Sequence, residues 1–340
     1  MKSYLQRLMN HESLTEAEML DVSRTFFTDS VTDSQLAAFI TALKLKGETV
    51  DEIVGLVRAV REQTLKFENV GGCIDNCGTG GDGSHSFNIS STSAFVLAGA
   101  GIPVAKHGNR SVSSKTGSAD VLEHLGIHLN VTPEQNEQQL KNIGITFLFA
   151  QHVQPKMGRI MKVRRELGIP TIFNLIGPLT NPIELETQVL GIYRRDYTEV
   201  FAESLKRLGR KRAVVLNGAG GMDEASLQGD NELVILEEGK IRKVILRPEE
   251  VNLPVYNNEA IRGGDAKENA EILLKVLNGE KGAYKDTVLL NAGIGIFAAG
   301  KAMSIEEGIE LARHSIDSGA ALSKLEQLVT NSSLYEKAGI

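Results

Sequence analysis

The sequence contains no tryptophan, and aromatic residues make up only 5% of its 340 residues. This scarcity argues against a surface that binds nucleic acid by stacking bases on aromatic rings. Long apolar runs are also missing, because none approaches the ~20 residues that a membrane-spanning helix requires. The start of the chain lacks the charged-then-apolar order of a signal peptide. We therefore expect a cytoplasmic protein with no membrane partner.

Cysteine and positive charge are scarce as well. The only two cysteines, Cys73 and Cys77, cannot build a disulfide framework, and their spacing without a second His/Cys pair is a poor zinc pattern. Lysine and arginine number 37 against 43 acidic residues, which leaves a net charge of −6. Such a balance gives no general attraction to nucleic acid or anionic membranes. Any phosphate site must therefore be local and built by the fold.

The remaining composition is that of an ordinary globular protein. Apolar residues make up 41% of the chain and charged residues 24%. The length exceeds the ~100–200 residues of a typical domain, which predicts two domains. Glycine is abundant at 34 residues, and this fits an α/β protein with tight turns and close backbone approaches.

The N-terminal part of the sequence predicts helices only. Thr15, Thr32 and Thr49 are each followed three residues later by Glu or Gln, the pattern of a capping box at a helix start. The segment from Asp33 to Lys46 ends at Gly47, a natural helix C-cap. We therefore predict a small all-helical domain over residues 1–66, completed by a helical segment near 160–182.

After this part, short apolar runs alternate with helical stretches. The C-terminal segments 269–277 and 287–328 again predict helices. Strands that alternate with helices indicate a mostly parallel sheet with helices on its faces, so residues 67–340 are predicted to form a larger α/β domain. The expected strands begin at Ile74 and include 103–105, 146–149, 189–192, 212–216 and 233–236, with helices between them such as 90–100 and 118–125.

A glycine-rich stretch follows the first expected strand. Four glycines between Gly78 and Gly83 allow backbone N–H groups to approach an anion closely, and a helix is expected to begin near Ser90. The spacing matches neither a P-loop nor a dinucleotide fingerprint. A tight structural turn is the alternative. The polar run Asn88–Ser93 favours a ligand, because a single N-cap residue would suffice to start the helix.

Residues 106–115 form a second polar stretch, placed after an expected strand. Ligands of open α/β sheets bind at this end of the strands. Three cations, an asparagine and serines predict a second phosphate clamp with Lys106 as the charge partner. His107 is a weaker candidate for a general base, because an isolated histidine is more often structural.

Two further candidates lie in the second half of the chain. Pro155 and Gly168 suit the first turn and the end of a helix whose apolar face includes Arg164, with Arg165 at its flank. A buried arginine needs an anion, either an internal acid or a bound carboxylate. The adjacent acids Asp223 and Glu224 follow an expected strand and a glycine-rich loop, and suit Mg²⁺ that bridges to substrate phosphates.

Taken in order along nearly the whole chain, these segments resemble the anthranilate phosphoribosyltransferase family, which has the nucleoside phosphorylase-II type of fold. The resemblance implies a homodimer and transfer of a phosphoribosyl group from 5-phosphoribosyl-1-pyrophosphate (PRPP) to anthranilate in tryptophan biosynthesis. The family commonly has a basic residue where Pro170 stands. The motifs are GTGGD at 78–82, NIS at 88–90, KHGNR at 106–110, RRELG at 164–168, FNLIGPLTNP at 173–182 and Asp223-Glu224.

The same resemblance implies roles for individual residues. Lys106, His107, Asn109 and Arg164 are the catalytic candidates, and Gly78, Asn109 and Arg164 would meet anthranilate. Two Mg²⁺ ions per monomer are implied, one held by Ser90 and Glu224 and the other by Asp223 and Glu224. The residues implied to contact PRPP are Gly78, Gly81, Asp82, Ser86, Asn88, Ile89, Ser90, Ser91, Lys106, His107, Gly108, Asn109, Arg110, Ser111, Val112, Ser113, Ser114 and Ser118.

Two other functions remain open at this point. A pyrimidine-nucleoside phosphorylase shares the fold type and a phosphate loop, but has no need of paired acids for a metal and usually carries an extra C-terminal domain. A non-enzymatic nucleic-acid-binding relative would be basic and would lack the acidic pair, whereas this chain is acidic and has it.

Overall fold

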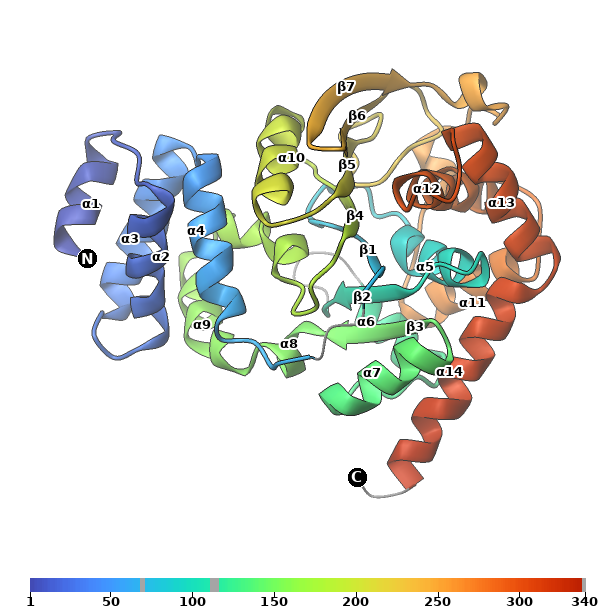
Figure 1. Cartoon of the computed structure of the whole chain (residues 1–340), viewed down its shortest axis with the longest axis horizontal. Helices are drawn as coiled ribbons and strands as arrows, with labels where there is room; N and C mark the ends of the chain where they lie inside the picture. Colours follow the sequence, from blue (N-terminus) through green and yellow to red (C-terminus); the bar gives the residue numbers. More distant parts are fainter. Residues whose placement is uncertain (68–70, 111–115, 338–340) are drawn as a thin grey trace.

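The computed structural model describes residues 1–67, 71–110 and 116–337, and it combines a small helical unit with a larger α/β unit (Figure 1). No helix in these ranges is both long and apolar enough to cross a membrane. The predicted fold class, a small all-helical N-terminal domain followed by an α/β domain with a mostly parallel sheet, is confirmed.

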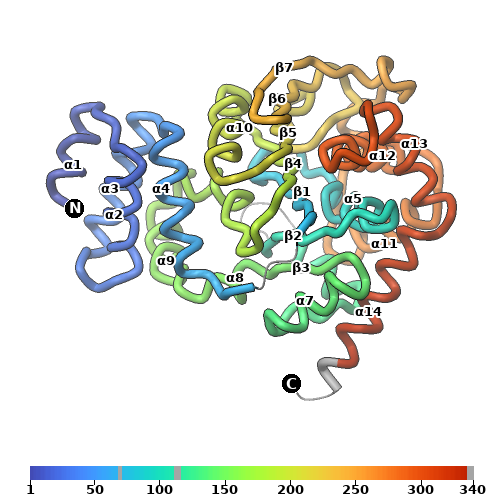
Figure 2. The backbone as a smooth tube through the Cα atoms, in the orientation of Figure 1, coloured from blue at the N-terminus to red at the C-terminus, as the bar shows by residue number. Residues whose placement is uncertain are grey.

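The helical unit begins the chain. Its helices are α1 (Lys2–Met9), α2 (Glu16–Arg24), α3 (Asp33–Lys46) and α4 (Val50–Arg61). The three predicted capping boxes are present, and the Thr15, Thr32 and Thr49 hydroxyls each accept a hydrogen bond from the backbone N–H three residues later. α9 (Gly158–Leu167), far from these helices in sequence, lies against α3, where Arg159 and Lys162 both pair with Asp33 (Figure 2).

A buried carboxylate ties this unit together. The side chain of Glu52 is fully buried, and its Oε2 lies 2.8 Å from the Lys46 ammonium. Its other oxygen accepts a hydrogen bond of 3.0 Å from the backbone N–H of Leu14. Because Glu52 also completes the capping box of α4, one side chain connects the loop before α2, the end of α3 and the start of α4.

The α/β unit is built on a seven-stranded sheet in the order β3-β2-β1-β4-β5-β6-β7. The five strands from β3 to β5 are parallel, and β6 and β7 form an antiparallel hairpin at one edge. β7 was not predicted from sequence, because its residues are mostly exposed or half-buried and form no continuous apolar run. The strands are β1 (Ile74–Gly78), β2 (Val104–Gly108), β3 (Ile145–Phe149), β4 (Thr187–Gly191), β5 (Arg212–Asn217), β6 (Asn231–Glu237) and β7 (Lys240–Leu246).

Alternating side chains of β4, β5 and β6 enter two separate cores. Val189 and Val214 pack with the C-terminal helices on one face, whereas Leu190 and Val215 pack with α10 and the helical unit on the other. This alternation is the expected pattern for a sheet covered on both faces. The remaining helices are α5 (Ile89–Gly99), α6 (Ser118–His124), α7 (Pro133–Asn142), α8 (Ala150–Val153), α10 (Thr198–Arg207), α11 (Ala266–Leu277), α12 (Ala283–Ala298), α13 (Ile305–Asp317) and α14 (Ala320–Lys337).

Short 3-10 helices connect many of these elements. One of them corrects a prediction, because Pro155 starts η2 and α9 begins only at Gly158. The predicted end of that helix is correct, since Gly168 follows it in a left-handed conformation with φ of 63°. The 3-10 helices are η1 (Thr25–Phe27), η2 (Pro155–Met157), η3 (Ile172–Asn174), η4 (Gly177–Thr180), η5 (Arg195–Tyr197), η6 (Pro248–Val251) and η7 (Asn258–Ile261).

The strand order places a switch point between β1 and β4. The chain builds the sheet from β1 through β2 to β3, and then returns to add β4 on the other side of β1. In open α/β sheets, ligands bind beyond the carboxyl ends of the strands at such a point. The segments that follow β1, β2, β4 and β5 are therefore the expected place of a site.

We predict that Glu52→Ala destabilises the protein by about 3–5 kcal/mol, because the change leaves the buried Lys46 ammonium without its partner. Urea unfolding followed by circular dichroism measures this loss. Glu62→Ala is the matched control, since Glu62 pairs with Arg24 at the surface, where 39% and 48% of the two side chains are exposed. An equal loss of stability in both variants would contradict the role given to Glu52.

Candidate active site

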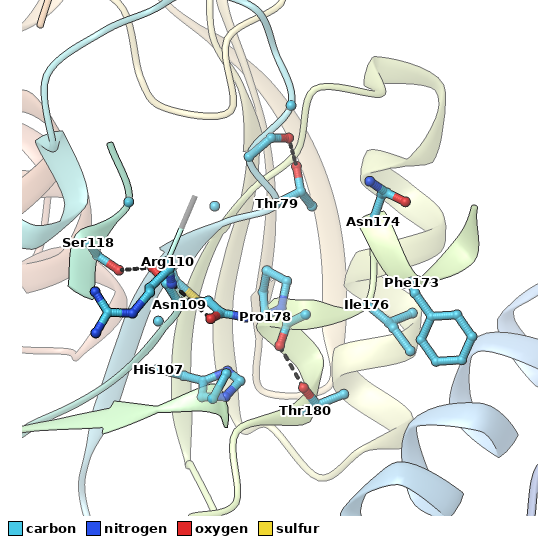
Figure 3. Close-up of a pocket in the computed structure, with 18 of the residues that line it drawn as sticks. Thr79, His107, Asn109, Arg110, Ser118, Phe173, Asn174, Ile176, Pro178 and Thr180 are labelled. Atoms are coloured by element: carbon cyan, nitrogen blue, oxygen red, sulfur yellow. Dashed lines mark hydrogen bonds between the residues drawn. The ribbon is translucent and has the colours of Figure 1, made fainter. Parts of the chain in front are cut away.

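A cavity of about 790 Å³ opens at the switch point (Figure 3). Its walls come from the carboxyl ends of β1 and β2, from the acidic loop after β5, and from α9 with the segment that follows it. Most residues predicted to form the site line it, although they come from six separate parts of the chain. They are Gly78, Gly81, Asn88, Ser90, Ser91, Lys106, His107, Gly108, Asn109, Arg110, Ser118, Arg164, Asp223 and Glu224.

Some predicted substrate contacts lie elsewhere. The Ile89 side chain belongs to the apolar core under α5 and is only 1% exposed. Ser86 accepts a hydrogen bond from the Ser84 hydroxyl, and Asp82 accepts one of 3.3 Å from the backbone N–H of Asp223, but neither residue lines the cavity. Ser111, Val112, Ser113 and Ser114 lie outside the described residues.

Glycines at the strand ends determine where the acidic pair sits. A Cβ atom on Gly191, the last residue of β4, would lie 1.5 Å from the carbonyl oxygen of Asp223. A Cβ on Gly218, just after β5, would lie 2.0 Å from the carbonyl oxygen of Glu224. Since real side chains do not tolerate such distances, the acidic loop can cross these strand ends only where glycine stands.

The two carboxylates are held in a buried, electrostatically unfavourable place. Asp223 Oδ2 accepts a 2.5 Å hydrogen bond from the Gly80 N–H, but burial and the nearby acids Asp82 and Glu224 raise the pKa of Asp223 well above its usual range. Burial also raises the pKa of Glu224 to about 7, although Lys106 and the Ser90 hydroxyl oppose the change. Charge of the opposite sign would stabilise both carboxylates.

This donor set fits magnesium. The described residues contain no group of three or more His, Cys, Asp or Glu side chains arranged to hold a metal by themselves. Mg²⁺ commonly uses one or two carboxylates and completes its coordination with waters and substrate phosphates. The Ser90 hydroxyl and the carboxylates of Asp223 and Glu224 therefore suit a magnesium that is bound together with a phosphorylated ligand.

Two asparagines of the C-terminal helices form hydrogen bonds that hold the acidic loop and the start of α5 in place. The sequence analysis gave neither asparagine a role in the site. Asn291, in the middle of the apolar helix α12, exchanges two 2.9 Å hydrogen bonds with the backbone N–H and C=O of Ala225, the residue after Glu224. Asn269 of α11 donates to Asn88 Oδ1 at 2.9 Å. A buried asparagine in an apolar helix is the signal that could have identified the first of these.

The end of β2 contributes a lysine and a histidine. Lys106 is only 3% exposed and lies near Glu224, whose charged form it favours. His107 is buried beside the backbone of Gly177, and burial lowers its pKa. Its Nε2 has no hydrogen-bond partner in the described part of the chain. Because its pKa is lowered, the imidazole is neutral at physiological pH, and it forms part of the cavity lining.

Arg164 has no internal acid to neutralise it. No carboxylate of the described residues lies within ion-pair distance, and the guanidinium contacts Met161 Sδ at 3.2 Å and lies 5.9 Å from the centre of the Phe173 ring. Burial alone lowers the pKa of Arg164. Among the described residues, therefore, no internal acid pairs with Arg164, and the carboxylate of a ligand would supply the opposite charge. Arg165, at the flank, is exposed but also lines the cavity.

Arg110 is arranged differently. Its guanidinium is 2.7 Å from Asp120 and 2.6 Å from Glu123, both on α6, and it lies 5.4 Å from the centre of the Phe149 ring. Although Arg110 lines the cavity, its hydrogen-bonding groups are directed to α6. Sequence could not reveal these acids as partners, because nothing in their spacing from Arg110 shows that the fold brings them together.

Several lining residues were given no role from sequence, although Thr79, Asn174 and Pro178 stand in motifs that carry the family resemblance. Gln151 follows the end of β3, Tyr193 follows the end of β4, and Thr79 lies within the glycine-rich loop. Asn174 and Pro178 belong to the segment after α9. Position after a strand was the available signal, but a single polar or aromatic residue there is too common to be specific.

Comparisons with known proteins identify the family of the chain. Residues 2–64 match the helical bundle domain of a glycosyl transferase family, and residues 71–322 match the a/b domain of the same family. The anthranilate phosphoribosyltransferase of Bacillus mycoides (strain KBAB4) is 57% identical over 333 residues, which cover 98% of both chains.

Solved structures give the same result. The crystal structure of anthranilate phosphoribosyltransferase (TrpD) from Thermus thermophilus matches with a TM-score of 0.91 and 40% identity, over 97% of this chain and 99% of that one. The Saccharomyces cerevisiae enzyme in complex with PRPP and Mg matches with a TM-score of 0.89 and 26% identity, over 97% of both chains. This chain belongs to the anthranilate phosphoribosyltransferases of the glycosyl transferase family.

Proposed function

We propose that the protein transfers the phosphoribosyl group of PRPP to the amino group of anthranilate, which gives N-(5-phosphoribosyl)anthranilate and pyrophosphate in tryptophan biosynthesis. The single observation that carries this proposal is a cavity with chemically distinct ends. One end has the glycine-rich loop, Lys106 and the acidic pair, and the other has the unpaired Arg164.

The first end suits PRPP. Gly78 and Gly81 expose backbone N–H groups, Asn88, Ser90 and Ser91 supply polar groups at the start of α5, and Lys106 supplies a positive charge. Gly108, Asn109, Arg110 and Ser118 line the same region. We propose that Asp82, Ser86 and Ile89 also contact PRPP, although these three residues do not line the cavity themselves.

Magnesium belongs to this end as well. We propose two ions per monomer, one near Ser90 and Glu224 and the other near Asp223 and Glu224. Bound magnesium would neutralise the negative charge that develops on pyrophosphate as it leaves. The protein's own part is to hold both carboxylates buried and in place through the Gly80 N–H, the Ser90 hydroxyl and Asn291.

The second end suits anthranilate. The Arg164 guanidinium can take the carboxylate in a bidentate contact, with Phe173 beside it and Asn109 and Gly78 toward the donor sugar. Loss of pyrophosphate makes C1 of the ribose oxocarbenium-like, and an aromatic amine is unprotonated near neutral pH. Positioning and electrostatic stabilisation therefore account for the reaction, and we assign His107 a place in the wall rather than a strong base.

Other properties follow from family membership. We propose that the protein is a homodimer in the cytoplasm, with the domain division predicted from sequence, 1–66 and 67–340. The two family models meet between residues 64 and 71, which supports a boundary in that interval. The proposed partners are small molecules only, without nucleic acid or membrane, and the net charge of −6 supports this.

A direct assay tests the function. We expect the protein, mixed with PRPP, Mg²⁺ and anthranilate, to consume anthranilate and thereby abolish its fluorescence. No loss of fluorescence, together with turnover of thymidine and phosphate, would support a pyrimidine-nucleoside phosphorylase. Binding to nucleic acid without either turnover would support the non-enzymatic relative.

Arg164→Gln should raise KM for anthranilate by about tenfold to a hundredfold, because the substrate carboxylate loses the cation proposed to bind it in a bidentate contact. KM for PRPP should change little, since the PRPP contacts come from other elements. Steady-state kinetics with each substrate varied in turn measures both values. Lys162→Gln is the control, since this exposed cation of the same helix pairs with Asp33 and does not line the cavity, and an equal effect there would argue against a specific carboxylate contact.

Glu224→Gln should weaken magnesium activation by about tenfold or more, because the change removes a charged oxygen that Mg²⁺ prefers. A Mg²⁺ titration of activity at saturating PRPP measures this shift. Asp230→Asn is the matched control, since that carboxylate is exposed in the same connection between β5 and β6 and pairs with Arg247. Unchanged magnesium dependence in Glu224→Gln would remove this residue from the proposed metal site.

A further inference from the structure

One wall of the cavity is a short segment whose backbone is held by side chains from distant elements. We call residues Gly177–Thr180, which form η4, the wall segment. Gly177, Pro178 and Thr180 line the cavity, and Figure 3 shows Pro178 and Thr180 near His107. The segment follows Phe173, which lies against Arg164, so it belongs to the end of the cavity assigned to anthranilate.

Three of its carbonyl oxygens accept hydrogen bonds from side chains outside it. Pro178 receives one of 2.6 Å from Gln188 of β4, and Thr180 receives one of 3.1 Å from Gln154, the residue after α8. Leu179 receives two from Arg61, of 3.0 Å from Nε and 2.7 Å from Nη2. The Thr180 hydroxyl donates to the remaining carbonyl, that of Gly177, at 2.8 Å.

Arg61 is the unusual member of this set. It is the last residue of α4 and therefore belongs to the helical unit, whereas the sheet and its connections supply the other two donors. No carboxylate in the described ranges lies within ion-pair distance of it, and burial lowers its pKa to about 10. A desolvated guanidinium that directs two donors to one carbonyl makes a charge-assisted contact, which is stronger than a neutral one.

We infer that Arg61 is a positioning residue for the acceptor substrate: it fixes the wall segment so that the aromatic acid held by Arg164 is aligned with the donor sugar. This inference depends on the proposed function. The neighbouring residue Val60 lines the cavity itself. The end of α4 therefore contributes to the site twice, through the side chain of Val60 and through the hydrogen bonds of Arg61 to Leu179. The helical unit thereby sets one wall of a cavity whose donor end belongs to the sheet.

A purely structural role for Arg61 makes a different prediction. If the contact only stabilised the packing of α4, its loss would lower the folded fraction and reduce the amount of active enzyme, without changing KM for either substrate. A displaced wall instead weakens the binding and alignment of one substrate. Errors of about 1 Å in alignment cost up to about a hundredfold in rate.

The test compares Arg61→Gln with Arg58→Gln. Arg58 is one turn earlier on the same helix and is exposed; it also contacts a carbonyl across the unit boundary, that of Arg207, but it does not approach the cavity. We expect Arg61→Gln to raise KM for anthranilate about tenfold, with KM for PRPP within about twofold of the original. Arg58→Gln should change neither value, and Arg61→Lys should recover part of the loss.

Gln154→Met provides a second test, because it removes the donor to Thr180 without touching Arg61. It should also raise KM for anthranilate selectively, and it decides the matter if Arg61→Gln does not fold. Unchanged KM for anthranilate in these variants, or an equal rise for both substrates, would overturn the inference. A wild-type protein that does not consume anthranilate would instead overturn the proposed function, before any variant is compared.

Discussion

The close contact between an acidic loop and the glycine ends of the strands is the constraint on which the site depends. Gly191 and Gly218 stand where a side chain would overlap the backbone carbonyls of Asp223 and Glu224. Gly78 is equally constrained, since a Cβ there would lie 2.2 Å from Asp223 Oδ2. The ends of three parallel strands thus fix the position of the two acidic residues. The glycine-rich loop after β1 lies against the same acids, since the Gly80 N–H donates to Asp223.

This geometry explains how an acidic protein can hold a diphosphate. Burial and the neighbouring Asp82 raise the pKa of both carboxylates, and Glu224 also raises that of Asp223, so bound divalent cations would stabilise their charged forms. Lys106 and the backbone N–H groups of the glycine-rich loop add positive potential within the same small volume. The net charge of the chain is therefore irrelevant to substrate binding, because the favourable field is confined to the cavity.

Sequence predicted the parts of this arrangement that depend on neighbouring residues. Capping boxes at Thr15, Thr32 and Thr49, the glycine-rich loop and the acidic pair all carry their signal within a few positions. Contacts between distant segments were not predictable in this way. The ion pairs of Arg110 with α6 and the clamp from Arg61 join residues that only the complete fold brings together.

The lack of an acid beside Arg164 among the described residues also has a consequence for the affinity of the enzyme for its acceptor substrate. An arginine that is already desolvated, and that has no acid among the described residues to displace, is prepared for an anionic ligand before the ligand binds. Burial of Ile160 and Val163 of the same helix in the helical core offsets the free energy needed to desolvate Arg164. The proposed recognition of the acceptor by Arg164 is thus supported by the stability of the helices that pack around α9.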